Sequence, residues 1–321
     1  MVVLAHLLTT VICLSSLSTT LAATIPPQKR AANGTCCGYY VENRDGFFRF
    51  KHEIDFSTLT SIDKVYEAGW EVSHGWQAGG KNEITGQIPM ADEKNVELIK
   101  GQGLRLKVPR QDKNAKTISV AEISFPDLLL GGVIEMTVQL TNIAGTCMGM
   151  FTTHADGGLA KPFGWQDEQD IEILGGNLFV GNEFQPSGIQ MYNWEPKTGA
   201  KSQGIEPFPA GADPSKGFHT YSIAWFPTTS DSNPPRLTEY RFDGRSINRP
   251  QQFPSINPSA LILNHWSNGD GRWSGGPPLQ DVYMTIKRGV AYYDKPTKLA
   301  SGAEVLKTTT CSRATACRVN V

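Results

Sequence analysis

The sequence has no surplus of charge of either sign. Its 321 residues contain 30 Lys and Arg against 31 Asp and Glu, which gives a formal net charge of −1. Nucleic acids and anionic membranes attract proteins through a basic surface. The balance of charge therefore argues against either as the main partner and is compatible with a neutral ligand.

The signatures of several enzyme classes are also missing. No Gly-x-Ser-x-Gly occurs, which argues against the nucleophile elbow of serine hydrolases. The Gly-x-x-x-x-Gly-Lys-Ser/Thr phosphate loop is absent as well. Histidine is scarce, with 6 residues, and the cysteine spacing fits no common zinc pattern. We therefore expect no metal and no required cofactor, and leave a structural calcium ion open.

No apolar run at the N-terminus is long enough for a membrane anchor, which needs about 20 residues. Residues 1–23 are instead apolar, then small and polar, and end in Leu-Ala-Ala. This pattern predicts a secretory signal peptide. Residues 24–30 end in a dibasic pair, Lys29-Arg30, and could form a short pro-segment. We therefore expect a secreted protein without a membrane anchor.

The mature chain would be one domain over residues 31–321, and we expect a monomer. Asn33 begins an Asn-Gly-Thr sequon, which predicts N-glycosylation in a secreted protein.

Cysteine is sparse, with six residues, of which Cys13 lies in the predicted signal peptide. The remaining five are Cys36, Cys37, Cys147, Cys311 and Cys317. In an oxidising compartment most of them should pair. Cys311 and Cys317 are close enough in sequence to close a small loop, and one of the adjacent pair could join a distant partner. Because five is odd, at least one thiol stays free or bonds between chains.

No stretch shows a period of 3.6 residues over three turns, whereas apolar and polar residues alternate in many short segments. These segments are residues 103–108, 133–140, 219–226, 237–244, 260–266 and 281–293. Gly, Pro, Asn and Asp separate them. Short strands without helices between them predict an all-β protein, an antiparallel two-sheet β-sandwich or jelly roll.

Acidic residues gather in one predicted strand, "GWQDEQDIEILGG" at residues 164–176. Side chains of a strand alternate between two faces, so Glu168, Asp170 and Glu172 share one face. Ile171 and Ile173 take the other, where Asp167 and Gln169 also point. Gln169 stands where the pattern calls for an apolar residue, so its buried amide needs hydrogen-bond partners.

Three acids on one face without a cation repel one another. Repulsion and partial burial should raise at least one pKa, which places a proton donor beside an ionised carboxylate. Glycoside hydrolysis uses such a pair. A calcium site and a solvated polar face are the alternatives. A straight strand wraps a cation poorly, and a solvated face would usually mix Lys, Thr and Ser among the acids.

Three segments in order carry a family resemblance. Glu168 to Glu172 match the Glu-x-Asp-x-Glu motif of glycoside hydrolase family 16, as found in its lichenases. "FHTYSIAWFP" at 218–227 and "LNHWSNGDGRWSGGPP" at 263–278 resemble two downstream segments of that family. The similarity covers about residues 95–295. It implies a concanavalin A-like β-jelly roll, with a concave sheet that lines a substrate cleft.

The resemblance also implies roles. Glu168 would be the nucleophile, Glu172 the general acid/base, and Asp170 between them would tune protonation. Residues four apart on a strand have Cα atoms about 13 Å apart, whereas the carboxyls of a retaining pair lie about 5–5.5 Å apart. Two long Glu side chains that lean together on a twisted, concave strand can close much of that gap.

Sugar rings lie on aromatic faces while their hydroxyls bind polar groups. From the motif positions, the substrate-binding candidates are Trp165, Gln190, Tyr192, Trp194, His219, Trp266 and Trp273. Core packing is the alternative for the tryptophans, and a strand-capping role for His219. Trp225 alternates with apolar residues and is expected in the core.

We therefore expect a secreted enzyme that acts on a β-glucan polysaccharide and hydrolyses internal β-1,3/β-1,4 bonds. A cell-wall transglycosylase could use the same glycosyl-enzyme intermediate. A non-catalytic lectin on a jelly roll is the alternative from another class, although a lectin need not keep all three carboxylates.

Overall fold

The computed structural model describes residues 36–112, 114–154, 167–195, 198–226, 236–296 and 311–321. The predicted signal peptide and pro-segment, the sequon at Asn33 and the candidate Trp165 lie outside these residues. Within the described ranges, no helix is long and apolar enough to span a membrane.

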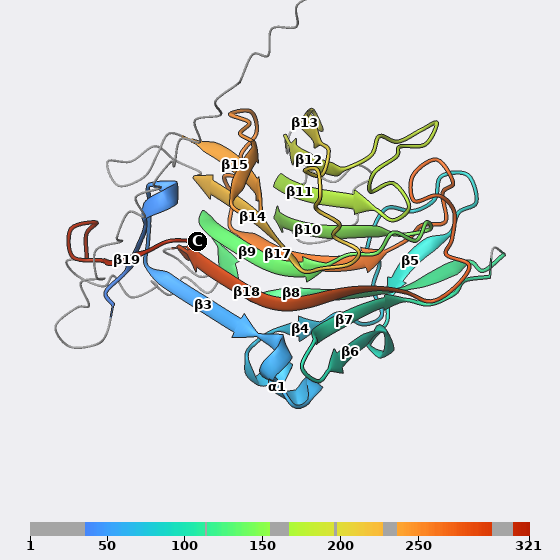
Figure 1. Ribbon diagram of the computed structural model, residues 1–321, viewed down its shortest axis with the longest axis horizontal. Helices are drawn as coiled ribbons and strands as arrows, with labels where there is room; N and C mark the ends of the chain where they lie inside the picture. The colour runs from blue at the N-terminus through green and yellow to red at the C-terminus, as the bar shows by residue number, and fades with distance from the viewer. Residues whose placement is uncertain (1–35, 113, 155–166, 196–197, 227–235, 297–310) are drawn as a thin grey trace, which may run out of the picture.

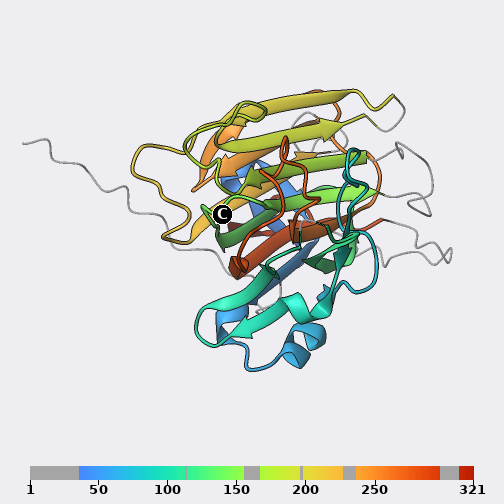
Figure 2. The same ribbon diagram turned by 90° about the vertical axis from the view of Figure 1, so that its right-hand side faces the viewer.

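Two large, mainly antiparallel sheets form the structure, which confirms the predicted all-β sandwich (Figures 1 and 2). The first sheet has the order β13-β12-β11-β10-β17-β8-β4, and β5 also pairs with β8. Its strands are β4 (Glu71–Val72), β5 (Ile88–Ala91), β8 (Thr117–Leu129), β10 (Cys147–His154), β11 (Asp167–Leu174), β12 (Ile189–Trp194), β13 (Lys201–Glu206) and β17 (Ser259–Trp266).

The second sheet has the order β16-β15-β14-β9-β18-β7-β6, and β3 also pairs with β18. Its strands are β3 (Phe50–Asp55), β6 (Val96–Ile99), β7 (Gly103–Val108), β9 (Gly132–Gln139), β14 (His219–Phe226), β15 (Leu237–Phe242), β16 (Arg245–Asn248) and β18 (Val282–Tyr293). All six segments predicted from alternation coincide with or overlap a strand of one of the two sheets.

Helical structure in the described chain is confined to short elements. These are α1 (Ile62–Glu67) and three 3-10 turns, η1 (Glu42–Arg44), η2 (Phe56–Thr58) and η3 (Glu93–Asn95).

Apolar side chains from the facing sides of the two sheets form the main core. Alternation puts Leu104 and Leu106 of β7 into this core, and Ile171 and Ile173 of β11 enter the same core from the first sheet. Trp225 of β14 is fully buried in the same cluster, as expected. Because this alternation buries one face of β11, the acidic face must point away from the core.

A third, small sheet joins the two ends of the described chain. β1 (Tyr39–Val41) pairs in parallel with β19 (Cys317–Val319) and antiparallel with β2 (Gly46–Phe48) (Figure 1). The suggested pairing of Cys311 with Cys317 is wrong. Cys36 bonds to Cys317 and Cys37 bonds to Cys311, because β1 and β19 lie side by side and bring both cysteine pairs within reach.

Among the cysteines that the structure describes, Cys147 is free and buried, in agreement with the odd number of cysteines after residue 23. It lies at the start of β10, far from the terminal sheet in sequence.

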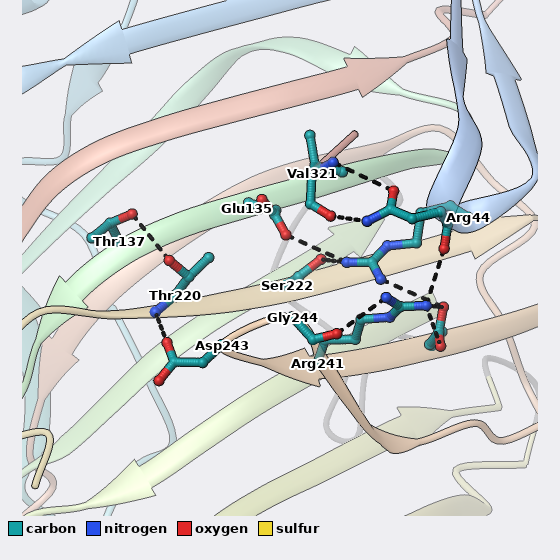
Figure 3. A network of polar contacts seen from close by, with 11 residues as sticks. Arg44, Glu135, Thr137, Thr220, Ser222, Arg241, Asp243, Gly244 and Val321 are labelled. Atoms are coloured by element: carbon teal, nitrogen blue, oxygen red, sulfur yellow. Dashed lines mark hydrogen bonds and ion pairs between the residues drawn. The ribbon is translucent and has the colours of Figure 1, made fainter. Parts of the chain in front are cut away.

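Arg44 docks the terminal sheet onto the outward face of the second sheet (Figure 3). Its buried guanidinium donates to Ser222 Oγ at 3.2 Å and lies 3.4 Å from Glu135 Oε1 and 4.0 Å from Glu239 Oε2. Burial raises the pKa of Glu135 to about 7, against the opposing charge of Arg288. The arginine therefore meets two carboxylates in a site that disfavours unpaired charge.

Replacement of Arg44 by Ala should lower the free energy of unfolding by about 3 kcal/mol at neutral pH, because it leaves carboxylates buried without their cation. The loss should shrink at pH 5, below the Glu135 pKa of about 7, where that carboxyl is protonated. Urea unfolding at both pH values measures this. Arg245→Ala, which breaks the more exposed pair with Glu206, is the control; equal losses from both variants would contradict the expectation.

Candidate functional site

The carboxylates of β11 stand on one face, as predicted. In register with β10 and β12, Glu168 lies between Thr153 and Trp194, and Glu172 lies between Gly149 and Gln190. Asp170 occupies the position between the two glutamates and is buried, whereas both glutamates are half-buried. The three carboxyl groups thus share a face of the first sheet that points away from the core, which we call the carboxylate face.

The two polar residues of the opposite phase are structural. Asp167 accepts hydrogen bonds from the main-chain N–H groups of Ile256 and Asn257, each at 2.8 Å. The fully buried Gln169 donates to Thr152 Oγ1 at 3.1 Å and accepts from the hydroxyl of Thr238. The expectation that Gln169 has partners on the core side is therefore confirmed.

This amide belongs to a polar connection between the sheets. Thr238 and Tyr240 lie on β15 of the second sheet, whereas Gln169 and Asn193 lie on β11 and β12 of the first. Asn193 Nδ2 donates to Thr238 Oγ1 at 3.1 Å, and Tyr240 donates to Asn193 Oδ1 and to the main-chain oxygen of Tyr192. Two strands that form the candidate site are thereby fixed against the opposite sheet.

Asp170 is the acid most strongly biased toward its protonated form. Burial raises its pKa well above the usual range, and the charges of Glu168 and Glu172 add to this. Trp194 Nε1 donates to Asp170 Oδ2 at 2.9 Å, and the carboxyl of Asp170 is hydrogen-bonded to Glu168. A protonated Asp170 can thus donate to Glu168 and stabilise negative charge there.

Different neighbouring groups lower the pKa values of Glu168 and Glu172 and so oppose the effect of burial. Burial raises the pKa of Glu168, while the hydrogen bonds of Thr153 and Asp170 lower it. Burial first, and the charge of Glu168 second, raise the pKa of Glu172 to about 7, against the effects of Lys201 and Cys147. The sequence analysis put mutual repulsion first, but burial is the larger cause. Glu172 can therefore carry a proton beside a carboxylate whose charged form is supported by two hydrogen bonds.

Strand β12 adds an aromatic wall next to the acids. Gln190, Tyr192 and Trp194 share the carboxylate face, as expected from their spacing. The Tyr192 hydroxyl donates to Gln190 Oε1 at 2.5 Å, and the Tyr192 and Trp194 rings lie 6.2 Å apart. Lys201 Nζ lies 4.7 Å and 5.0 Å from the centres of these two rings.

Trp266 and Trp273, the substrate-binding candidates from residues 263–278, belong to one cluster of packed side chains. Trp266 of β17 is directly opposite Cys147 on the carboxylate face and is 8% exposed. Trp273 is partly buried against the same cluster. Gly79 packs on the Trp266 ring, since a side chain at Gly79 would collide with it. Trp266 therefore combines the packing role considered as its alternative with a place on the candidate surface.

His219 does not lie in the sheet that carries the three carboxylates. His219 begins β14 in the second sheet, where its Nδ1 lies 2.6 Å from Asp243 Oδ2 and its ring stacks on Phe242. β14 pairs with β9 and β15 and not with β11. Alternation identified the strand but could not say to which sheet it belongs.

Glu122 is a carboxylate that the sequence analysis missed. It lies on β8 in the same cross-strand row as Glu172, with Gly149 and Asn264 between them. Glu122 Oε1 accepts from Ser73 Oγ at 2.9 Å and from Trp76 Nε1 at 3.1 Å, and burial raises its pKa. A single acid among the mostly apolar residues 118–123 was the available signal.

A groove of about 870 Å³ lies elsewhere on the described chain. Residues of β3, β9, β18 and β19 line it, including Glu135 and Arg288, on the outward face of the second sheet. It contains none of the carboxylates of β11. Within the described residues, no group of three or more His, Cys, Asp or Glu side chains is arranged to hold a metal ion.

Comparison with known proteins identifies the family of the chain and several solved structures with a similar fold. The profile of Glycosyl hydrolases family 16 matches residues 85–286. A lichenase from a mouse hindgut metagenome is similar in structure, with 21% identity, a TM-score of 0.55, and coverage of 76% of this chain and 98% of its own. A β-glucanase of Bacillus licheniformis has 19% identity, a TM-score of 0.56 and the same coverage.

The catalytic domain of an endo-1,3-β-glucanase (laminarinase) from Thermotoga petrophila is also similar, with 20% identity and a TM-score of 0.54, over 77% of this chain and 98% of its own. At these identities the structural likeness establishes the fold. The comparison with curated proteins finds no match.

Glu172 should titrate near pH 7 rather than near its ordinary value of 4.5, because it is buried beside Glu168. Carbon-13 NMR of protein labelled at the glutamate carboxyl carbons measures this directly. Glu135, on the other sheet, should also titrate near 7. Glu172→Gln and Glu135→Gln should each remove one of the two resonances. If every glutamate titrated below pH 5.5, the electrostatic description of the site would be wrong.

Proposed function

Because the chain belongs to glycosyl hydrolases family 16, we propose that it is a secreted, retaining endo-β-glucanase. Its substrate would be a cell-wall polysaccharide, cleaved at internal β-1,3 or β-1,4 bonds. The observation that carries this proposal is the row Glu168, Asp170 and Glu172, in which a carboxyl with a pKa of about 7 shares a face with one whose charged form accepts hydrogen bonds from Thr153 and Asp170.

The proposed reaction has two steps. Glu172 donates its proton to the glycosidic oxygen as the bond from C1 to that oxygen breaks, and the Glu168 carboxylate attacks C1 to form a covalent glycosyl-enzyme. Glu172, now ionised, removes a proton from water while the water oxygen attacks C1 and releases Glu168. Two inversions at C1 leave its configuration unchanged.

Asp170 would support the first step through its own proton. Its hydrogen bond to Glu168 stabilises the anion needed for attack, and the Trp194 indole holds the Asp170 carboxyl in place at 2.9 Å. Since Glu172 acts only when protonated, the rate should fall as the pH rises through its pKa of about 7. It should also fall at acid pH, where Glu168 becomes protonated.

Several groups around the acids suit a sugar polymer. Tyr192 and Trp194 provide ring faces next to β11, and Gln190 Nε2 is a buried donor without a hydrogen-bond partner among the described residues. Trp76 is 53% exposed and is held by Glu122 at the other side of the same face. Aromatic faces with a few oriented polar groups are the usual composition of carbohydrate-binding clefts.

Secretion is supported by the predicted signal peptide and by the two disulfides, which persist in oxidising compartments. The choice of β-glucan rests on the motif that resembles lichenases, since the similar structures are too distant in sequence to indicate a substrate.

Glu168→Ala and Glu172→Ala should each lower the hydrolysis rate by at least about 1,000-fold, because either change removes a group that acts in bond cleavage. The substrates are mixed-linkage glucan, laminarin, xyloglucan and a galactan. Glu53→Gln, on the second sheet, should retain full activity. Retained turnover in a correctly folded Glu168 or Glu172 variant would exclude that residue from the proposed role.

The same assay separates hydrolysis from transfer. Products longer than the donor, formed only when an oligosaccharide acceptor is added, would establish transglycosylation by the same intermediate. Proton NMR of the first product formed should show the β-anomer, as retention requires. Binding without any cleavage or transfer would favour a lectin and overturn the proposal.

A further inference from the structure

The free cysteine contacts the proposed acid/base. Cys147 is fully buried at the start of β10, and its Sγ lies 3.9 Å from Glu172 Oε1. Directly opposite Glu172 on β10 is Gly149, which has no side chain. Cys147, two residues earlier on the same face, is therefore the diagonal neighbour of Glu172 whose side chain can reach the carboxyl.

The Cys147 thiol can act only as a neutral proton donor. Burial, followed by the charges of Glu172 and Asp170, raises its pKa well above the usual range, so it keeps its proton at neutral pH. The main-chain N–H of Ile173 and the indole of Trp266 interact with the sulfur as donors. The acceptor within reach of the thiol is Glu172 Oε1, at 3.9 Å, so the S–H proton can be donated to that carboxylate.

We propose that Cys147 is a positioning residue for the reaction, whose S–H···O contact orients the Glu172 carboxyl and favours its ionised form. The kinetic consequence rests on the proposed function, in which Glu172 is the acid/base. The contact itself does not. Cys147 would thereby help to set the pH above which the proposed acid loses its proton, and would connect Trp266 of β17 to that carboxyl.

The other groups that face Glu172 act by different means. Glu168 on its own strand raises the Glu172 pKa by its negative charge, and Lys201 on β13 lowers it by its positive charge. From β12, Gln190 is directly opposite, and the Tyr192 hydroxyl is directed to Gln190 Oε1. Lys201 is exposed, so its effect should be screened by salt, whereas a buried thiol contact should not be.

The test is the pH dependence of kcat/KM for Cys147→Ala and Cys147→Ser. Cys147→Ala lacks the donor, so the basic limb of the profile, where kcat/KM falls as the pH rises, should move upward by about half a pH unit. Above that limb the protonated fraction of Glu172 should be roughly threefold larger than in the wild type. Serine keeps a hydroxyl donor and should hold the limb at or below the wild-type position. Equal upward shifts in both variants, or no shift in either, would overturn the inference.

Two control variants separate a contact from a general effect. Val120→Ala removes buried apolar atoms from the same cluster and should lower stability without moving the limb. Lys201→Met should move it upward at about 0.01 M salt and much less at about 1 M, where the Debye length falls from about 30 Å to about 3 Å. The shift in Cys147→Ala should persist at both salt concentrations; a shift that disappears at high salt would contradict a contact mechanism.

Carbon-13 titration of Glu172 in the same variants gives a readout that needs no activity. A Glu172 pKa that rises in Cys147→Ala and not in Cys147→Ser supports the contact even if no polymer is cleaved, in which case only the proposed function fails. A Glu172 pKa unchanged in all variants, together with full loss of activity in Glu172→Ala, leaves the function standing and excludes a role for Cys147.

Discussion

The polar connection behind β11 is the interaction on which the carboxylate face depends. Side chains alternate along a strand, so a slip of one residue would turn the acids into the core and the isoleucines outward. Gln169 has its partners, Thr152 and Thr238, only in the observed register. Since a buried polar group left without a partner costs about 1–3 kcal/mol, the amide that interrupts the apolar face also specifies which face carries the acids.

Once the register is fixed, the acids must be accommodated as neighbours in a partly dry environment. The protein does this by biasing Asp170 and Glu172 toward their protonated forms, mainly through burial. A carboxyl whose folded pKa is raised contributes stability below its unfolded pKa, and that contribution is lost as the pH rises through the folded value. For Glu172 the loss falls between about pH 4.5 and about pH 7. The proton that Glu172 would donate in the proposed reaction is thus one that stabilises the fold.

Much of this arrangement could be predicted from the sequence, and the failures have physical causes. Alternation located the strands and placed Glu168, Asp170 and Glu172 on one face, because the period of a strand is local. It could not assign β14 to a sheet, so it could not decide between sugar binding and strand capping for His219. Proximity in sequence suggested Cys311 with Cys317, but the parallel pairing of β1 with β19 decides the bonds. Glu122 was missed because the cross-strand row that joins it to Glu172 runs over β8, β17, β10 and β11. The order of these strands in the sheet does not follow their order in the sequence.

A shifted pKa alone does not distinguish a reactive carboxyl from a structural one. Glu135 and Glu172 both reach a pKa of about 7, and burial is the first cause for each. Glu135 lies against the guanidinium of Arg44, which leaves it with a neutralising partner. Glu172 instead shares its face with a second carboxyl, Glu168, for which the hydrogen bonds of Thr153 and Asp170 oppose the effect of burial. Acid–base chemistry at one bond needs two groups in opposite protonation states, and of these two sites only the row on β11 provides them.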